Sequence, residues 1–245
     1  VNGNIAIGYN ALAGGDFVDQ DKDLTGNIAI GKNALDATAS YQSIGQIAIG
    51  EEALTALTSG SRSVAVGYQA GQTATTIDYT TIVGYQAGQK LLDSTHNTLV
   101  GYNSGYSLGS DQADNNTFIG SKAGQQVTSS SSNTFVGVGA GESTSSTPLT
   151  SGSRNVALGV NAGNVLQGAA SENIAIGCFA GDAITTANNN VIIGDQAGSG
   201  LTTQGGNVAI GHNALQTGQS VDNVVIGNNA GLQLTADENV IIGLN

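Results

Sequence analysis

Histidine and cysteine, the residues most often used for catalysis or metal binding, are scarce in this sequence. His96 and His212 are the only histidines, and Cys178 is the only cysteine. His212 and Cys178 both follow the glycine of a recurring motif, at a position that elsewhere holds side chains as different as Tyr9 and Lys32. A position that accepts any side chain is expected at the surface. We therefore predict no catalytic residue and no cofactor.

Three alternating aspartates could bind calcium. The spacing of Asp19, Asp21 and Asp23 resembles the start of a calcium-binding loop. Such a loop also needs glycine at its sixth position and glutamate at its twelfth, which are Leu24 and Ile30 here. Calcium binding is therefore a weaker hypothesis than a solvated acidic loop.

Arg62 and Arg154 are the only arginines. Each ends a copy of the segment Leu-Thr-Ser-Gly-Ser-Arg, at 57–62 and 149–154. A guanidinium group can bind the carboxylates of acidic sugars, so both are receptor-binding candidates. The alternative is that a loop conformation is reused for its geometry.

Tyr68, Tyr85 and Tyr102 occupy the same position in three consecutive repeats. Each is followed by an amide side chain, namely Gln69, Gln86 and Asn103. Aromatic rings beside amides could form a platform for sugar rings, which makes these tyrosines receptor-binding candidates. The alternative is a ladder of stacked rings that stabilises the fold.

A repeat positions all of these residues. It consists of Asn, three apolar or β-branched residues and Gly, with Ala three residues later. The glycine recurs at intervals of 16 to 23 residues, at Gly8, Gly31, Gly50, Gly67, Gly84, Gly101, Gly120, Gly137, Gly159, Gly177, Gly194, Gly211, Gly227 and Gly243. Such intervals suit one coil of a parallel β-solenoid. We predict an all-β fold of about 14 coils, forming a single repeat domain over 1–245.

The three residues before each glycine are expected to form a short strand. We place the residue directly before the glycine inside the coil. The middle residue, which a strand points to the other face, is also apolar in every repeat. A lone solenoid needs one apolar face, so the second predicts a homotrimer. The interface candidates are Ile82, Leu99, Phe118, Phe135, Ile192, Val225 and Ile241. The alternative is a single flattened coil that buries both faces.

Other repeat positions predict how the coils stack. Asn precedes the strand in most repeats, so side-chain amides can hydrogen-bond from coil to coil. The repeat glycine indicates a positive φ or a close backbone approach. A second short strand is expected to begin at the alanine.

Two families carry similar motifs. Residues 4–8, 173–177 and 207–211 (Asn-Ile-Ala-Ile-Gly and Asn-Val-Ala-Ile-Gly) resemble the head repeats of trimeric autotransporter adhesins. Residues 116–120, 133–137 and 85–89 (Asn-Thr-Phe-Ile-Gly, Asn-Thr-Phe-Val-Gly and Tyr-Gln-Ala-Gly-Gln) resemble repeats of phage tail fibres and tailspikes. The resemblance implies a left-handed parallel β-roll in which three chains associate. Separately, a rise of about 4.8 Å per coil predicts a rod.

Composition restricts the partners. Lys and Arg number 6 against 18 Asp and Glu, a formal net charge of −12, so we expect no binding to nucleic acid. No apolar run is long enough to cross a bilayer, and no membrane insertion is expected. The chain begins and ends within a repeat, which suggests a segment of a longer fibre with neighbouring segments as partners.

We therefore expect a non-catalytic, extracellular, trimeric segment of a phage tail fibre or a surface adhesin. It would space or present loops that attach to a host glycan or protein receptor. The alternative is the head of a bacterial trimeric autotransporter adhesin that binds host matrix or cells.

Two weaker alternatives are a polysaccharide-degrading tailspike and an ice-binding solenoid. The first needs paired carboxylates in an aromatic cleft, whereas the acidic residues are scattered and aromatics make up 4%. The second needs a regular threonine array, whereas Thr81, Thr98, Thr117 and Thr134 fill one position in four coils only, on the face predicted to be buried.

Overall fold

A computed structural model describes residues 3–13, 24–37, 43–109, 113–144 and 146–244. These residues contain β-strands that pair in parallel and no helix, so none of them forms a helix that could span a membrane. The chain divides into two compact units, Val1–Asn116 and Thr117–Asn245. Both units consist of stacked coils, as the repeat predicts. The fold is a parallel β-solenoid.

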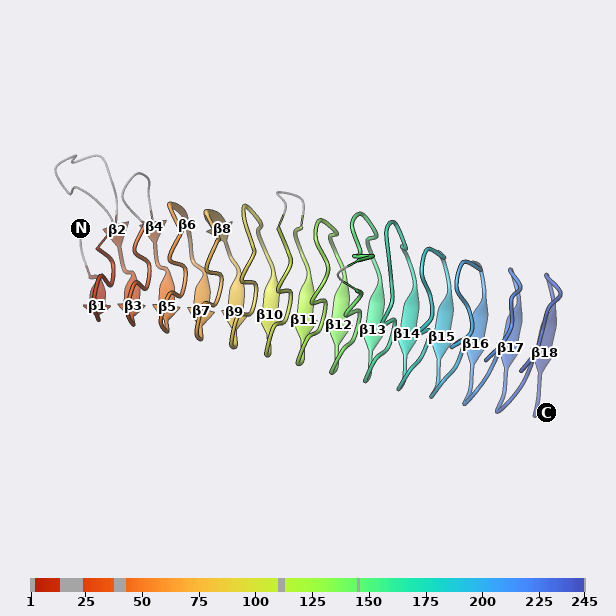
Figure 1. Cartoon of the computed structure of the whole chain (residues 1–245). Helices are drawn as coiled ribbons and strands as arrows, with labels where there is room; N and C mark the ends of the chain where they lie inside the picture. Colours follow the sequence, from red (N-terminus) through yellow and green to blue (C-terminus); the bar gives the residue numbers. More distant parts are fainter. Residues whose placement is uncertain (1–2, 14–23, 38–42, 110–112, 145, 245) are drawn as a thin grey trace. The chain divides into compact units, whose positions relative to one another are not determined.

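Unit 1 (Val1–Asn116) contains two parallel sheets (Figure 1). The strands before the repeat glycines pair in the order β1 (Ile5–Ile7), β3 (Ile28–Ile30), β5 (Ile47–Ile49), β7 (Val64–Val66), β9 (Thr81–Val83) and β10 (Thr98–Val100). A smaller sheet pairs β2 (Leu24–Thr25), β4 (Ser43–Ile44), β6 (Ser59–Ser61) and β8 (Thr76–Asp78). Equivalent residues of successive repeats are therefore direct neighbours.

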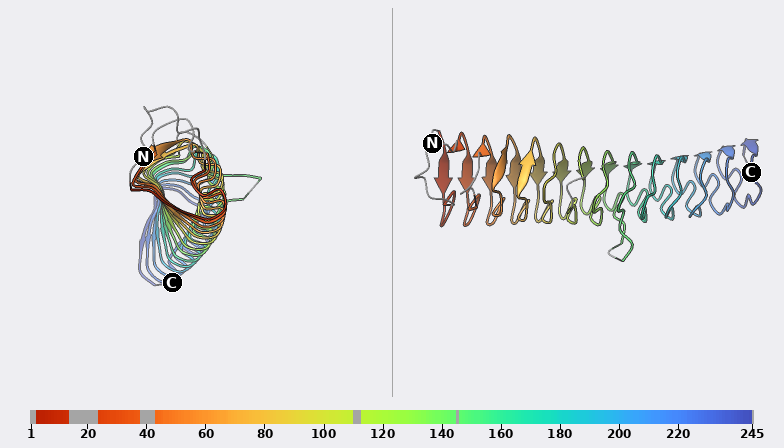
Figure 2. Two further views of the ribbon diagram at one scale, coloured as in Figure 1. Left: turned by 90° about the vertical axis from the view of Figure 1, so that its left-hand side faces the viewer. Right: turned by 90° about the horizontal axis from the view of Figure 1, so that it is seen from above.

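Unit 2 (Thr117–Asn245) has one such sheet. Its strands pair in sequence order: β11 (Thr117–Ile119), β12 (Thr134–Val136), β13 (Val156–Leu158), β14 (Ile174–Ile176), β15 (Val191–Ile193), β16 (Val208–Ile210), β17 (Val224–Ile226) and β18 (Val240–Ile242). Isolated parallel bridges also join Val127 to Leu149 and Leu149 to Gly168. The segment between β12 and β13 projects from the stack (Figure 2).

The second strand does not begin at the alanine, as the sequence suggested. Residues after the repeat glycine form turns. The strands of the smaller sheet in unit 1 lie instead before the position that holds Asn27 and, in the next three coils, Gln46, Ser63 and Thr80. The second and fourth residues after the glycine have left-handed φ values, +54° at Gln69 and +60° at Gly71. An extended strand needs negative φ at both positions, so the chain turns there.

The two faces of the repeat strand are reversed relative to the prediction. In the repeat strands other than the two end strands β1 and β18, the middle residue is buried inside its own coil. The two flanking residues are partly exposed on the outside. Ile82, Leu99, Phe118, Phe135, Ile192 and Val225 have 0% exposure, and Ile241 is the least exposed residue of the end strand β18. Their assignment to a trimer interface was therefore wrong. Alternation separates two faces, but it does not say which one points inward.

Several coils fill their interiors with complementary volumes. Where Leu stands four residues after the glycine, the middle strand residue is small, as in the pair Leu54 and Ala48. Phe118 instead faces Gly124, where a Cβ atom would lie 2.5 Å from the phenyl ring. The Phe118 ring also stacks on Phe135 of the next coil, with centroids 5.0 Å apart. The core is therefore continuous from coil to coil.

The repeat glycine brings neighbouring coils into close contact. Gly67 has a φ of +139°, and a Cβ atom there would lie 2.3 Å from the carbonyl oxygen of Gly84. Both reasons for glycine that the sequence suggested, a positive φ and a close backbone approach, are confirmed.

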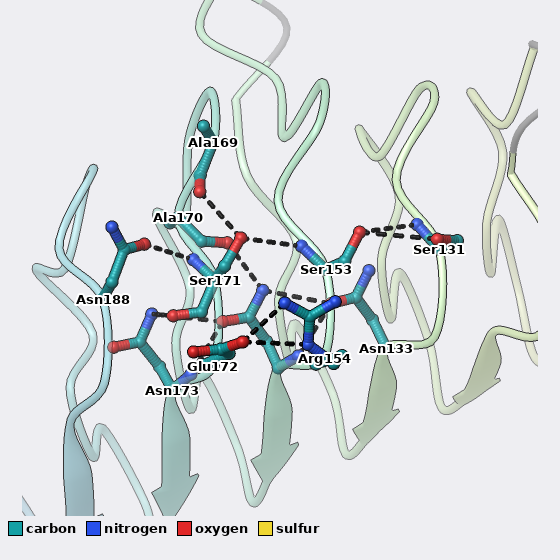
Figure 3. Close-up of polar contacts among 11 residues, drawn as sticks. Ser131, Asn133, Ser153, Arg154, Ala169, Ala170, Ser171, Glu172, Asn173 and Asn188 are labelled. Atoms are coloured by element: carbon teal, nitrogen blue, oxygen red, sulfur yellow. Dashed lines mark hydrogen bonds and ion pairs between the residues drawn. The ribbon is translucent and has the colours of Figure 1, made fainter.

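The expected asparagine ladder is also confirmed. Asn190 is fully buried, its N–H donates to Asn173 Oδ1 (3.2 Å), and its Nδ2 donates to Gln204 O (3.0 Å). Its own Oδ1 accepts from the N–H of Asn207 (3.0 Å). One asparagine side chain therefore pairs with a buried N–H group and a partly buried carbonyl group that both lie ahead of the next repeat strand. Figure 3 shows this ladder at Asn133 and Asn173.

The complementary volumes of Phe118 and Gly124 can be tested by substituting each residue alone and both together. Phe118→Ala should lower the free energy of unfolding by about 3–5 kcal/mol through a cavity. Gly124→Ala should lower it by about 1–3 kcal/mol through the clash, in addition to the cost of its φ of +59°. The double variant Phe118→Ala/Gly124→Leu recreates the pair seen at Ala48 and Leu54, and should recover part of the loss in urea unfolding.

Gly168→Ala is the matched control, because its φ is +53° and a Cβ atom there meets nothing within 4 Å. It should show the backbone cost alone, about 1–2 kcal/mol. If Gly124→Ala were no more destabilising than this control, Phe118 and Gly124 would not be packed as described.

The asparagine ladder makes a second prediction. Asn190→Ala should lower the free energy of unfolding by about 3 kcal/mol, because it leaves the Asn207 N–H and the Gln204 carbonyl without partners. Asn228→Ala, at an exposed position, should change it by less than about 0.5 kcal/mol. Equal losses in chemical unfolding would show that the buried amides contribute nothing specific.

Candidate functional site

The three tyrosines of unit 1 form a stacked ladder. The ring centroids of Tyr68 and Tyr85 are 5.2 Å apart, with planes inclined by 18°, and those of Tyr85 and Tyr102 are 5.6 Å apart, inclined by 16°. The stacked ladder that the sequence suggested is therefore present. The three residues are nevertheless 40%, 46% and 49% exposed, so their outer surface remains open to a ligand.

A row of amides runs beside the ladder. Gln86 Nε2 donates to Gln69 Oε1 (2.7 Å), and Gln69 Nε2 donates to Glu52 Oε2 (2.8 Å). Gln89 Nε2 also donates to Gln69 Oε1 (2.7 Å), and Gln72 Nε2 to Glu52 Oε2 (2.6 Å). These contacts fix the amide row in one arrangement next to the rings.

Arg62 belongs to a different column of unit 1. Its guanidinium carbon lies 5.5 Å from the ring centroid of Tyr79, and its Nη1 donates to the Tyr79 hydroxyl (2.7 Å). The Tyr79 ring stacks on His96, with centroids 5.2 Å apart. Sequence reasoning missed this column, although its members are spaced by 17 residues like the tyrosine ladder. Arg62 therefore already has an aromatic partner within the chain.

Arg154 in unit 2 is paired with an acidic residue. Its Nε donates to Glu172 Oε1 (3.0 Å), from one coil to the next (Figure 3). An external carboxylate would have to compete with Glu172. Beside this pair, Ser153 N–H donates to Ser171 Oγ (3.1 Å), and Ser171 N–H to Asn188 Oδ1 (2.7 Å). Polar side chains here link the coils to one another.

The residues with potential metal or acid–base chemistry are dispersed. His212 Nε2 lies 3.6 Å from Asp195 Oδ2, and both side chains are about half exposed. Cys178 is exposed. The described part of the chain contains no cluster of three or more His, Cys, Asp or Glu side chains that could hold a metal ion. The calcium candidates Asp19, Asp21 and Asp23 lie outside the described residues.

Asp182 is the one described carboxyl group with a clearly raised pKa. It lies in a shallow hollow with Phe179, Gln196 and Ser199. Burial raises the pKa of Asp182 and outweighs the backbone N–H groups of Asp182 and Ala183, which lower it. Its Oδ1 is buried without a hydrogen-bond partner. Gln216, the equivalent residue two coils later, instead donates its amide to Gln196 Oε1 (3.0 Å).

The segment that projects between β12 and β13 carries hydroxyl groups. Thr144 Oγ1 lies 2.5 Å from Thr147 Oγ1 and 3.2 Å from Ser146 Oγ. The Pro148 carbonyl accepts from the N–H of Gly168 (3.0 Å), which attaches the end of the segment to the following coil. The segment is therefore an anchored polar projection from unit 2.

No family model matches the chain, and no curated protein matches it. The geometry defines a parallel β-solenoid in which many polar side chains of the described residues connect one coil to the next. The exposed tyrosine ladder of unit 1 (Tyr68, Tyr85 and Tyr102) is the candidate binding site that combines open aromatic surface with a fixed polar row.

The raised pKa of Asp182 predicts that the stability of the fold depends on pH. Its folded-state pKa is raised, so the ionised carboxylate destabilises the folded protein at neutral pH. Asp182→Asn should therefore increase the free energy of unfolding near pH 7. The gain should shrink as the pH falls through the raised pKa toward the ordinary carboxyl range, where the wild-type group is also neutral.

The measurement is urea unfolding over a series of pH values. Asp222→Asn, which removes an exposed carboxylate from the same unit, controls for the change in net charge. A gain for Asp182→Asn that stayed constant from neutral to acidic pH would contradict the assignment.

Proposed function

We propose that the chain is a non-catalytic, extracellular segment of a homotrimeric fibre, from a phage tail fibre or a surface adhesin, that presents attachment surfaces to a host receptor. The observation that carries this proposal is the outward face of the repeat strands. In β15, for example, Val191 and Ile193 lie on the outside of the coil and are only partly buried. The same two columns are aliphatic or threonine in every repeat strand.

Another copy of the chain is the partner that best fits these columns. Successive coils present the same residue types in parallel register, as in the pairs Val191 with Val208 and Ile193 with Ile210. A rotation axis along the direction of stacking would bring equivalent columns of several copies together at every level. The interface is thus assigned to the flanking columns and not to the buried middle residues.

The resemblance to autotransporter heads and phage fibres supports three copies and a left-handed β-roll. It also supports neighbouring fibre segments and a host glycan or protein receptor as partners. A bacterial adhesin head that binds host matrix or cells remains the alternative within the same class.

No specific observation favours the polysaccharide-degrading hypothesis or the ice-binding hypothesis. A polysaccharide-degrading role needs a pair of carboxylates in a cleft. An ice-binding role needs a regular threonine array. The threonine column does face outward, contrary to the sequence-based expectation, but in each unit it contains only two consecutive threonines, Thr81 with Thr98 and Thr117 with Thr134. The rest of that column is aliphatic.

Light scattering tests the proposal. The wild-type chain should have a solution mass near three times 24.3 kDa. Ile193→Asp places a charge in the outward face and should reduce the mass to that of a single chain, because a buried unpaired carboxylate is costly. Circular dichroism checks that the variant is folded.

Val160→Asp is the matched control. Val160 is 45% exposed and occupies the column in which Asp195 occurs naturally, so the variant should remain trimeric. A wild-type chain that is monomeric at all concentrations would overturn the proposal.

A further inference from the structure

The tyrosine ladder lies in a column with the character of an external surface. The same position of the neighbouring coils in unit 1 holds Lys32 and Glu51, which form an exposed ion pair (3.1 Å). In unit 2 it holds the exposed pair Asp195 and His212. Charged residues are depleted from the buried centre of protein interfaces, so this column is suited to a soluble ligand.

The spacing of the tyrosine rings indicates the repeat length of a ligand that fits the ladder. The centroid separations of 5.2 Å and 5.6 Å are set by the distance between coils and recur in one direction. Because the rings are stacked on one another, their faces are turned toward each other, and their outer edges and hydroxyl groups account for their exposure of 40–49%. An extended chain of β-1,4-linked pyranose rings advances by a similar distance per sugar. Its successive sugars can therefore meet the outer edges of successive tyrosines.

The amide row supplies the polar half of the site. Gln69 and Gln86 follow Tyr68 and Tyr85 directly in the chain, and they are held by mutual hydrogen bonds and by Glu52. Amides offer both donors and acceptors, which suits the hydroxyl groups along the edge of a sugar ring. A row that is already fixed loses little conformational entropy on binding. The carboxylate of Glu52 favours a neutral glycan over an acidic one.

We propose that Tyr68, Tyr85 and Tyr102, with the amide row of Gln69 and Gln86, bind a neutral, extended β-1,4-linked glycan that lies along the ladder. This inference deepens the proposed function by naming the receptor class and the site. The ligand would cross one coil per sugar unit. Its affinity should therefore increase with chain length up to the length of the ladder.

Titration calorimetry of the full chain with defined oligosaccharides tests the proposal. Cellohexaose, chitohexaose or mannohexaose should bind, with hexasaccharides tighter than disaccharides. Maltohexaose should not bind, because its α-1,4 linkages curve the chain away from the ladder. Tyr85→Ala should weaken binding about tenfold, and Tyr85→Phe, which keeps the ring, should retain it.

Two further variants complete the test, one as a control and one as a second disruption of the ladder. Tyr9→Ala removes a 72% exposed tyrosine from the same column outside the ladder, and it should bind like the wild type. Tyr68→Asn introduces a residue that occurs naturally in this column as Asn228, so it serves if Tyr85→Ala fails to fold. It should also weaken binding.

The outcomes separate the inference from the proposed function. If no β-1,4-linked hexasaccharide binds, or if Tyr85→Ala and Tyr68→Asn bind like the wild type, the glycan site is overturned. Equal binding of maltohexaose would overturn the match between ring spacing and linkage. The solution mass of the same sample is an independent result. A monomer that binds contradicts the trimer alone, and a trimer that does not bind contradicts the site alone.

Discussion

Within each unit, successive coils approach one another closely at the repeat glycine, where the space that a Cβ atom would need is filled by the carbonyl group of the next repeat glycine. This contact allows one residue type only, so the backbone makes the same corner at every level. An identical corner holds the strands in residue-for-residue register, as between β7 and β9. The asparagine ladder, the aromatic stacks and the outward aliphatic columns all depend on that register.

The sequence was sufficient to predict the type of fold, because the repeat glycines and asparagines have one structural use each. It was insufficient to orient the strands, because all three strand residues are apolar or β-branched. The compensating volumes of Ala48 with Leu54, and of Phe118 with Gly124, contained the missing information. Residues six positions apart in the chain compensate for each other only if both point into the same interior.

The candidate site was partly predictable for a related reason. Tyr68, Tyr85 and Tyr102 stand at a fixed distance after the glycine, so their alignment follows from the repeat alone. The partners of Arg62 and Arg154 lie before the strand, where intervals between repeats vary in length and alignment is less obvious. Both arginines have partners in the next coil, Tyr79 and Glu172. Side chains that look available in a sequence can thus be part of the scaffold.

Within each unit, the hydrogen bonds between repeat strands join equivalent positions of adjacent coils. Loss or duplication of one repeat in frame would therefore bring together neighbours that already match in glycine, asparagine and strand register. Genetic recombination between repeats could lengthen or shorten such a protein without any new contact having to evolve. Each repeat gained or lost would then change the distance between a binding surface and its point of attachment by one strand separation, about 4.8 Å.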